Sequence, residues 1–245
     1  MILRRITQHV KDQNWFAVAL DFFIVVAGIL IAFQITNWNE ARSEKRLKEY
    51  YLERIQSDLT ETADYLSVRL AQAESALVII DAFVAALNDP VIEDEELVRI
   101  TTDYFARGTN LFDFKVKRTT FDELSSTGNL ELLGRGSYVA ALTRLNTDYA
   151  GRDQDLLVNT EWVTGFESAL VAEFDWFRFD ELTDHLFPSK PVADVALDIR
   201  ASGDKLRRHA AIHYWAVDDV RGDYETMIAD TKSVRDMTNS ELGGS

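Results

Sequence analysis

Cysteine is absent from this 245-residue chain, and proline occurs only at positions 90, 188 and 191. Without cysteine there is no disulfide bond, no thiolate nucleophile and no cysteine-ligated metal cluster. Because proline removes a backbone donor and breaks helices, its scarcity favours long uninterrupted helices. We therefore expect an all-α fold.

Positive charge is also scarce. The chain has 26 Lys and Arg against 41 Asp and Glu, a net charge of −15, and all of that charge lies after position 40. A general nucleic-acid-binding surface needs a basic patch, so no nucleic-acid partner is expected. The acidity favours a self-repelling soluble surface or a basic partner.

Signatures of catalysis are missing as well. The sequence has no phosphate-binding glycine loop, no dinucleotide fingerprint, no serine elbow and no zinc-protease motif. His209 and His213 have the i,i+4 spacing at which two imidazoles can share a metal, but the sequence identifies no third ligand. His213 lies on an apolar stripe, where a hydrogen-bonded core histidine is commoner. We predict no catalytic, cofactor-binding or metal-binding residue and no enzymatic activity; an enzymatic alternative would require a metal at this pair.

Long apolar runs are rare, and the one that is long enough to cross a bilayer spans residues 16–35. A hydrocarbon core about 30 Å thick needs about 20 helical residues. Trp15 and Trp38 bracket the run as interfacial anchors would, and no small-residue cleavage site follows it. The sequence therefore predicts an uncleaved transmembrane helix over 15–38, in contact with the lipid bilayer. A buried core helix and a signal peptide are the alternatives.

One face of this predicted helix carries small residues and a carboxylate. Gly28 and Ala32 form a small-xxx-small pair that lets helix backbones approach closely, and Ala17 and Asp21 share their face. We expect this stripe to be a helix–helix interface, in a homo-oligomer or with another membrane protein. Alternatively, Asp21 sits near the lipid headgroups and stays hydrated.

The rest of the chain reads as one acidic helical domain. From Glu40 to Asn88 nothing stops a helix, and its heptad-like seam suits packing in a bundle or, less commonly, a coiled coil; one break near 58–62 is allowed. Further helices are expected over 137–149, 153–177 and 204–237, with a cluster of aromatic residues over 174–179. The expected segments are an amphipathic leader (1–14), the transmembrane helix (15–38), a long stalk or bundle helix (39–88), the remainder of the domain (89–237) and a disordered tail (238–245).

The stretch 119–133, TTFDELSSTGNLELL, is a second distinctive segment. Thr120 and Glu123 have the spacing of a capping box, and Gly128-Asn129 suits a left-handed helix stop. A helix end followed by a tight turn explains the pattern, with a binding turn as the alternative.

Two stretches together resemble a known family. GILIAFQITNWNEAR (28–42) and FDELSSTGNLELL (121–133) are similar to the two signatures of a widespread bacterial family of single-span membrane proteins of unknown function. The resemblance implies a membrane-anchored helical protein, without an activity, substrate or cofactor. The positions that match the first signature are Asn37, Trp38, Asn39 and Glu40, and those that match the second are Glu123, Leu124, Ser126, Gly128, Asn129 and Leu130.

We therefore expect a membrane-anchored helical interaction or scaffold protein, acting as an oligomer or as a subunit of a membrane complex. The expected location is the bacterial inner membrane, in a single pass, with the C-terminal domain in the periplasm. An oligomeric channel or tension-responsive pore and a ligand-sensing extracytoplasmic domain are the two alternatives.

Overall fold

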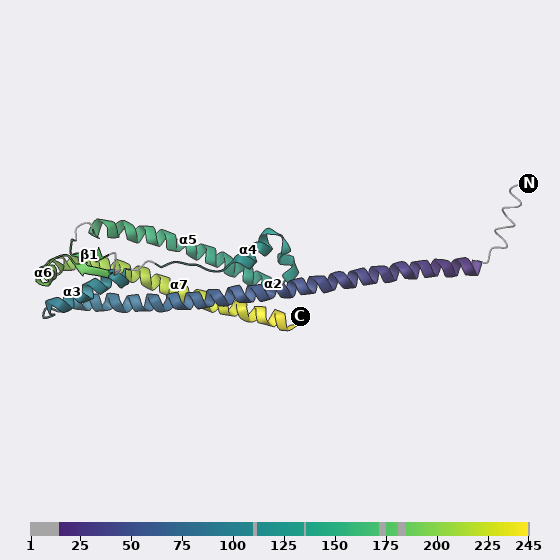
Figure 1. Ribbon diagram of the computed structural model, residues 1–245, viewed down its shortest axis with the longest axis horizontal. Helices are drawn as coiled ribbons and strands as arrows, with labels where there is room; N and C mark the ends of the chain where they lie inside the picture. The colour runs from purple at the N-terminus through teal and green to yellow at the C-terminus, as the bar shows by residue number, and fades with distance from the viewer. Residues whose placement is uncertain (1–14, 110–111, 135, 172–174, 181–184, 245) are drawn as a thin grey trace, which may run out of the picture. The chain divides into compact units, whose positions relative to one another are not determined.

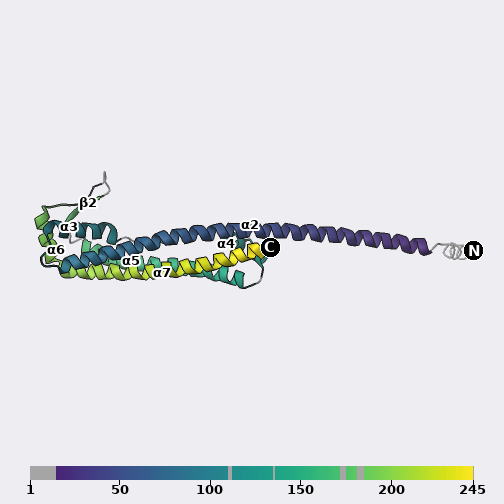
Figure 2. The same ribbon diagram turned by 90° about the horizontal axis from the view of Figure 1, so that it is seen from below.

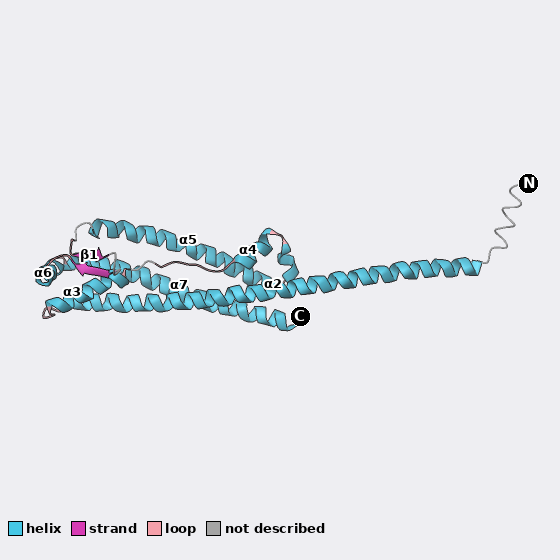
Figure 3. Ribbon diagram, in the orientation of Figure 1, coloured by secondary structure: helices cyan, strands magenta, loops and turns pink. Residues whose placement is uncertain are grey.

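A computed structural model describes residues 15–109, 112–134, 136–171, 175–180 and 185–244. In these ranges the chain is almost entirely helical, and one short two-stranded hairpin is the exception (Figure 3). The predicted all-α fold, with an apolar N-terminal helix followed by a helical bundle, is confirmed. The elements are α2 (Trp15–Asn88), α3 (Asp94–Asp103), the π-helix η1 (Tyr104–Gly108), α4 (Thr119–Ser126), the 3-10 helix η2 (Asn129–Leu133), α5 (Ser137–Val171), β1 (Phe177–Asp180), β2 (His185–Pro188), α6 (Val192–Ala201) and α7 (Gly203–Gly244).

Helix α2 is continuous for 74 residues and has no break at 58–62. No glycine or proline lies between Gly28 and Pro90, so nothing in the sequence interrupts its backbone hydrogen bonds. The chain divides into two compact units within this helix, residues 1–51 and residues 52–244. The second unit is the helical domain, and it begins at the first fully buried residue of the α2 seam, Leu52.

Three long helical segments, α2 from residue 52, α5 and α7, run alongside one another in the helical domain (Figures 1 and 2). The seam of α2 supplies buried residues along its length, including Leu66, Ile80 and Phe83. Helices α5 and α7 pack directly on each other, and a buried hydrogen bond of 2.5 Å joins the hydroxyls of Tyr149 and Thr231. Burial of these apolar faces stabilises the bundle more than intrinsic helix propensity does.

The segment 112–118 has no regular secondary structure and lies against the bundle. Phe112 and Phe114 are buried, and the intervening Asp113 contacts polar side chains of α2 and α7. The hydroxyl of Tyr65 donates to the Asp113 carboxylate at 2.6 Å, Arg69 forms an ion pair with it, and the hydroxyl of Tyr224 donates to its backbone carbonyl at 2.9 Å. These contacts tie α2 and α7 together through the connector.

Two predicted helices are in fact one. Helix α5 runs from Ser137 to Val171 and includes Gly151, where the sequence suggested an interruption. A glycine inside a helix costs only about 1 kcal/mol relative to alanine. Burial of Leu156 and Val163 beyond it outweighs that cost, so the helix continues.

The region after α5 forms a hairpin and a further helix, and β1 begins at Phe177, where we expected a helix to end. Strands β1 and β2 pair antiparallel, with Phe177 opposite Pro188. Helix α6 then begins directly after Pro191, whose fixed φ suits the residue before a helix. Trp176 of the predicted aromatic cluster is buried, whereas Phe174 lies outside the described residues.

The prediction that residues 238–245 form a disordered tail is wrong for the described residues, 238–244. Helix α7 continues to Gly244, and Thr238 is fully buried. Its hydroxyl donates to the hydroxyl of Tyr138 on α5 at 3.2 Å. This contact with a residue one hundred positions earlier gives the end of α7 a packing surface that the polar local sequence does not reveal. The predicted leader, 1–14, lies outside the described residues.

Candidate functional site

The apolar part of α2 is a membrane-spanning candidate by length and composition. None of the residues in its most apolar 18-residue window is buried within the protein, and Phe22, Phe23 and Phe33 are each more than 60% exposed. A core helix of a soluble domain would bury such residues, because exposed apolar surface is unfavourable in water. Asp21, Gly28 and Ala32 of the predicted interface stripe are also exposed on this helix. Ala17 belongs to α2 as well, but its side chain lies outside the described residues.

The first signature, Asn37 to Glu40, lies within α2, and all four of its side chains are exposed. The guanidinium of Arg42 lies 5.6 Å from the centre of the Trp38 ring. A cation over an indole keeps the charged group close to an amphipathic ring that prefers membrane interfaces. This arrangement suits the end of a membrane span.

The second signature closes a turn against α2, but its predicted capping box is wrong. Helix α4 begins at Thr119, so its N-cap residue is Arg118 and Thr120 already lies inside the helix. The carboxylate of Asp58 on α2 instead accepts the backbone N–H of Thr120 at 3.0 Å, and Glu123 forms a 2.7 Å ion pair with Arg54. Tertiary partners thus satisfy the groups that local capping would have served.

The remaining positions of this signature form the predicted turn. Gly128 has a φ of 73°, which confirms the left-handed helix stop, and Leu124 is fully buried. The hydroxyl of Ser126 donates to the backbone carbonyl of Glu123 at 3.1 Å. Asn129 begins η2, and these contacts give most of the signature a structural role.

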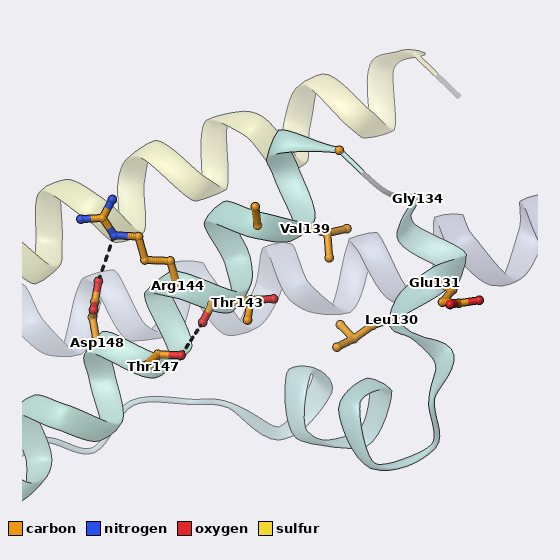
Figure 4. A pocket seen from close by; sticks show the side chains of 10 residues that line it. Leu130, Glu131, Gly134, Val139, Thr143, Arg144, Thr147 and Asp148 are labelled. Atoms are coloured by element: carbon orange, nitrogen blue, oxygen red, sulfur yellow. Dashed lines mark hydrogen bonds and ion pairs between the residues drawn. The ribbon is translucent and has the colours of Figure 1, made fainter.

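An open groove of about 600 Å³ lies between η2 and the first turns of α5 (Figure 4). Leu130 from the signature and Val139 from α5 line it, and Arg144 and Asp148 form a 3.7 Å ion pair at one end. The groove is therefore partly apolar and partly charged. Leu130 is the signature residue for which a binding role remains compatible with the geometry.

An exposed aromatic patch lies on α5 and α7. Trp162, Phe166 and Trp215 are each about half exposed, and the ring of Trp162 lies 4.9 Å from Phe166 and 5.3 Å from Trp215. None of these three residues was predicted from the sequence to have a functional role. Exposed clusters of tryptophan are typical of protein interaction surfaces.

The two histidines lie deep in the helical domain. His209 and His213 are 3% and 2% exposed, and their rings are 4.5 Å apart. The Nδ1 atom of His209 is 2.6 Å from the hydroxyl of Tyr104. The Nε2 atoms of both histidines are buried and have no hydrogen-bond partner among the described residues. A buried polar atom left unpaired costs about 1–3 kcal/mol, so two of them side by side call for an explanation.

A carboxylate from α5 completes the group. The Oε1 atom of Glu167 lies 3.9 Å from Nε2 of His213, and one ligand atom from each of the three residues lies within 4.8 Å of the other two. The sequence analysis missed Glu167. The available signal was its position four residues after Val163, which puts an acidic side chain on the buried face of α5.

Burial controls the protonation of this cluster. It lowers the pKa of His209 to about 3, with a smaller contribution from His213, and lowers the pKa of His213 to about 4. Burial also raises the pKa of the Glu167 carboxyl and of the Tyr104 phenol. Both imidazoles are therefore neutral at pH 7, and a neutral imidazole has one ring nitrogen whose lone pair can bind a metal or accept a hydrogen bond.

Comparison with protein-family models, with curated proteins and with solved structures finds no match. The chemically distinctive features of the chain are the exposed apolar segment of α2, the aromatic patch and the buried histidine–glutamate cluster.

Proposed function

We propose that the protein is a membrane-anchored helical interaction protein. The observation that carries this proposal is that no residue in the apolar window of α2 is buried within the protein, because a lipid bilayer removes such a surface from water. The resemblance of residues 28–42 and 121–133 to a family of single-span membrane proteins supports the same assignment. The bacterial inner membrane, with the acidic domain in the periplasm, is the location that we propose.

The interaction part of the proposal draws on two surfaces, one on each unit. The small-residue stripe around Gly28 and Ala32 suits close contact with another transmembrane helix. The aromatic patch of Trp162, Phe166 and Trp215 suits a protein partner for the helical domain. Either surface is compatible with a homo-oligomer or with a subunit of a larger membrane complex.

Native mass spectrometry of the protein extracted from its own membranes tests this proposal. The expected result is an intact chain, with residues 1–38 retained, in a defined assembly with itself or with a second protein. Replacing Gly28 by Ile should reduce an assembly formed by the span, and Gly151→Ala is the control, because its added methyl meets nothing within 4 Å. A chain that has lost its apolar segment, or a monomer under all extraction conditions, would contradict the proposal.

A ligand-sensing domain is the second candidate, and the groove between η2 and α5 favours it. An oligomeric channel follows from the same anchor if the mass spectrum shows a symmetric ring. Ion flux through liposomes that contain the purified protein separates the channel from the scaffold, because the scaffold predicts no flux.

A further inference from the structure

We propose that Glu167, His209 and His213 bind one divalent transition-metal ion of the Zn²⁺ class inside the helical domain. Three different chemical observations meet at this point. The site combines two imidazole nitrogens and one carboxylate oxygen, it is buried, and the Nε2 atoms of both histidines have no hydrogen-bond partner in the described part of the chain. The proposal is independent of membrane attachment, because every residue in it belongs to the helical domain.

The positions of the ligand atoms fit a metal after a small adjustment. Atoms that bind one tetrahedral metal ion at about 2.1 Å lie about 3.4 Å from each other. The three candidate atoms lie within 4.8 Å of one another, and His213 Nε2 and Glu167 Oε1 are 3.9 Å apart. Rotation of the Glu167 side chain, which is only partly buried, can bring its carboxylate closer to the two imidazoles.

The helical framework fixes the two histidines. They are four residues apart on α7, so both side chains lie on one face of the helix. Glu167 comes from α5, which packs directly on α7. Metal binding would therefore join two long helices of the bundle, and the bound ion would stabilise their packing.

Tyr104 gives His209 the outer partner that metal-binding histidines usually have. When Nδ1 of His209 donates its proton to the Tyr104 hydroxyl, 2.6 Å away, the lone pair of Nε2 is free for a metal. The Tyr104 ring is held in turn by stacking on Phe83, with ring centres 4.0 Å apart. Tyr104 is thus a positioning residue, and Glu167, His209 and His213 are the ligands.

The donor set indicates the class of metal. Two imidazoles and one carboxylate bind Zn²⁺ and other first-row divalent ions, whereas Ca²⁺ and Mg²⁺ prefer oxygen ligands alone. His213 also borders a cavity of about 20 Å³ between α5 and α7, which is large enough for one water molecule.

The test uses the full-length protein in detergent, freed of metal with a chelator and titrated with Zn²⁺ in excess Mg²⁺. The excess Mg²⁺ competes with Zn²⁺ for exposed carboxylates, because Mg²⁺ prefers oxygen ligands and the chain contains 41 Asp and Glu. We expect one Zn²⁺ per chain and a higher melting temperature with Zn²⁺ than without it. Co²⁺ in place of Zn²⁺ should give the intense visible absorption of a four- or five-coordinate ion.

Variants separate the site from the surface. His209→Gln, His213→Gln and Glu167→Gln should each weaken Zn²⁺ binding by about 100-fold or more, since each removes a direct ligand. Tyr104→Phe should weaken binding by about 10-fold, as expected for an outer partner. The matched controls are Glu161→Gln, at an exposed position on α5, the helix that carries Glu167, and His185→Gln, on β2. Both should bind Zn²⁺ as the wild type does.

The proposal is overturned if the wild-type chain takes up no stoichiometric Zn²⁺, or if the ligand variants bind it as tightly as the controls. Circular dichroism checks that each variant folds. Where a histidine variant does not fold, Glu167→Gln decides the question, because Glu167 is partly exposed and its amide replacement conserves shape. Unchanged binding and an unchanged Co²⁺ spectrum in that variant would assign the two histidines to the core alone.

Discussion

Gly108 lies against the ring of Tyr104, and its lack of a side chain leaves room for that ring. A Cβ atom at this position would lie 2.8 Å from Cδ2 of Tyr104, closer than carbon atoms pack. Tyr104 is fully buried and contacts both Phe83 and His209. The glycine in η1 therefore supports, through one aromatic ring, the orientation of a histidine on a different helix.

Replacing Gly108 by Ala should destabilise the protein by about 1–3 kcal/mol, because the ring of Tyr104 has no free space into which it can move. Urea unfolding followed by circular dichroism measures the change. Gly151→Ala is the control: its added methyl meets nothing within 4 Å, and we expect no loss of stability and up to about 1 kcal/mol of gain. Equal stability of the two variants would contradict the tight packing at Tyr104.

Of the four residues in the buried cluster, the sequence indicated only the two histidines. The spacing of His209 and His213 on one face of a helix is a local property, and the structure confirms that the two rings adjoin. Glu167 and Tyr104 join them from positions more than forty residues away, and no local pattern predicts which face of one helix meets another. The composition of the cluster therefore became apparent only once the packing of α5, α7 and η1 was known.

Among the secondary-structure elements, the end of α7 shows how a polar segment gains order. Residues 238–244 contain few apolar side chains, yet α7 continues through them because Thr238 packs against Tyr138 on α5. Burial raises the pKa of the Tyr138 phenol to about 12, so this phenol stays neutral and keeps its hydroxyl as a hydrogen-bonding group.

Replacing Thr238 by Val removes one hydroxyl while it conserves shape, and leaves the buried hydroxyl of Tyr138 without that partner. We expect a loss of about 1–2 kcal/mol in the free energy of unfolding. Thr226→Val on the same helix is the control, because the Thr226 hydroxyl is exposed and bonds only its own helix. If the two variants lose the same small amount, the end of α7 does not pack as described.

Helix positions were more predictable than helix ends. Apolar periodicity located α2, α5 and α7, because each buries one face in the bundle. Predictions of caps and breaks failed at Thr120, where Asp58 from α2 replaces the local cap, and at Gly151, where packing carries the helix onward. The β1–β2 hairpin was missed because its aromatic residues fit a helical stripe as well as a strand.

For the whole molecule, the strongest constraint on its function is the chemical contrast between its two units. The first unit exposes a long apolar helix, and the second is an acidic helical domain with its own core. An exposed apolar surface of this length is unfavourable in water and favourable in lipid. Membrane anchoring is therefore the central claim of the proposed function.

Alkaline extraction of membranes that contain the full-length protein tests this claim most directly. We expect the wild-type chain to stay in the membrane pellet. The double variant Val25→Lys/Ile29→Lys should be released, because lysine near the centre of a span costs about 2.5–3.5 kcal/mol per residue. Val68→Lys/Val78→Lys, at exposed positions on the same helix within the helical domain, should remain in the pellet with the wild type. Release of the wild-type chain, or release of the second variant but not the first, would contradict anchoring by the apolar segment of α2.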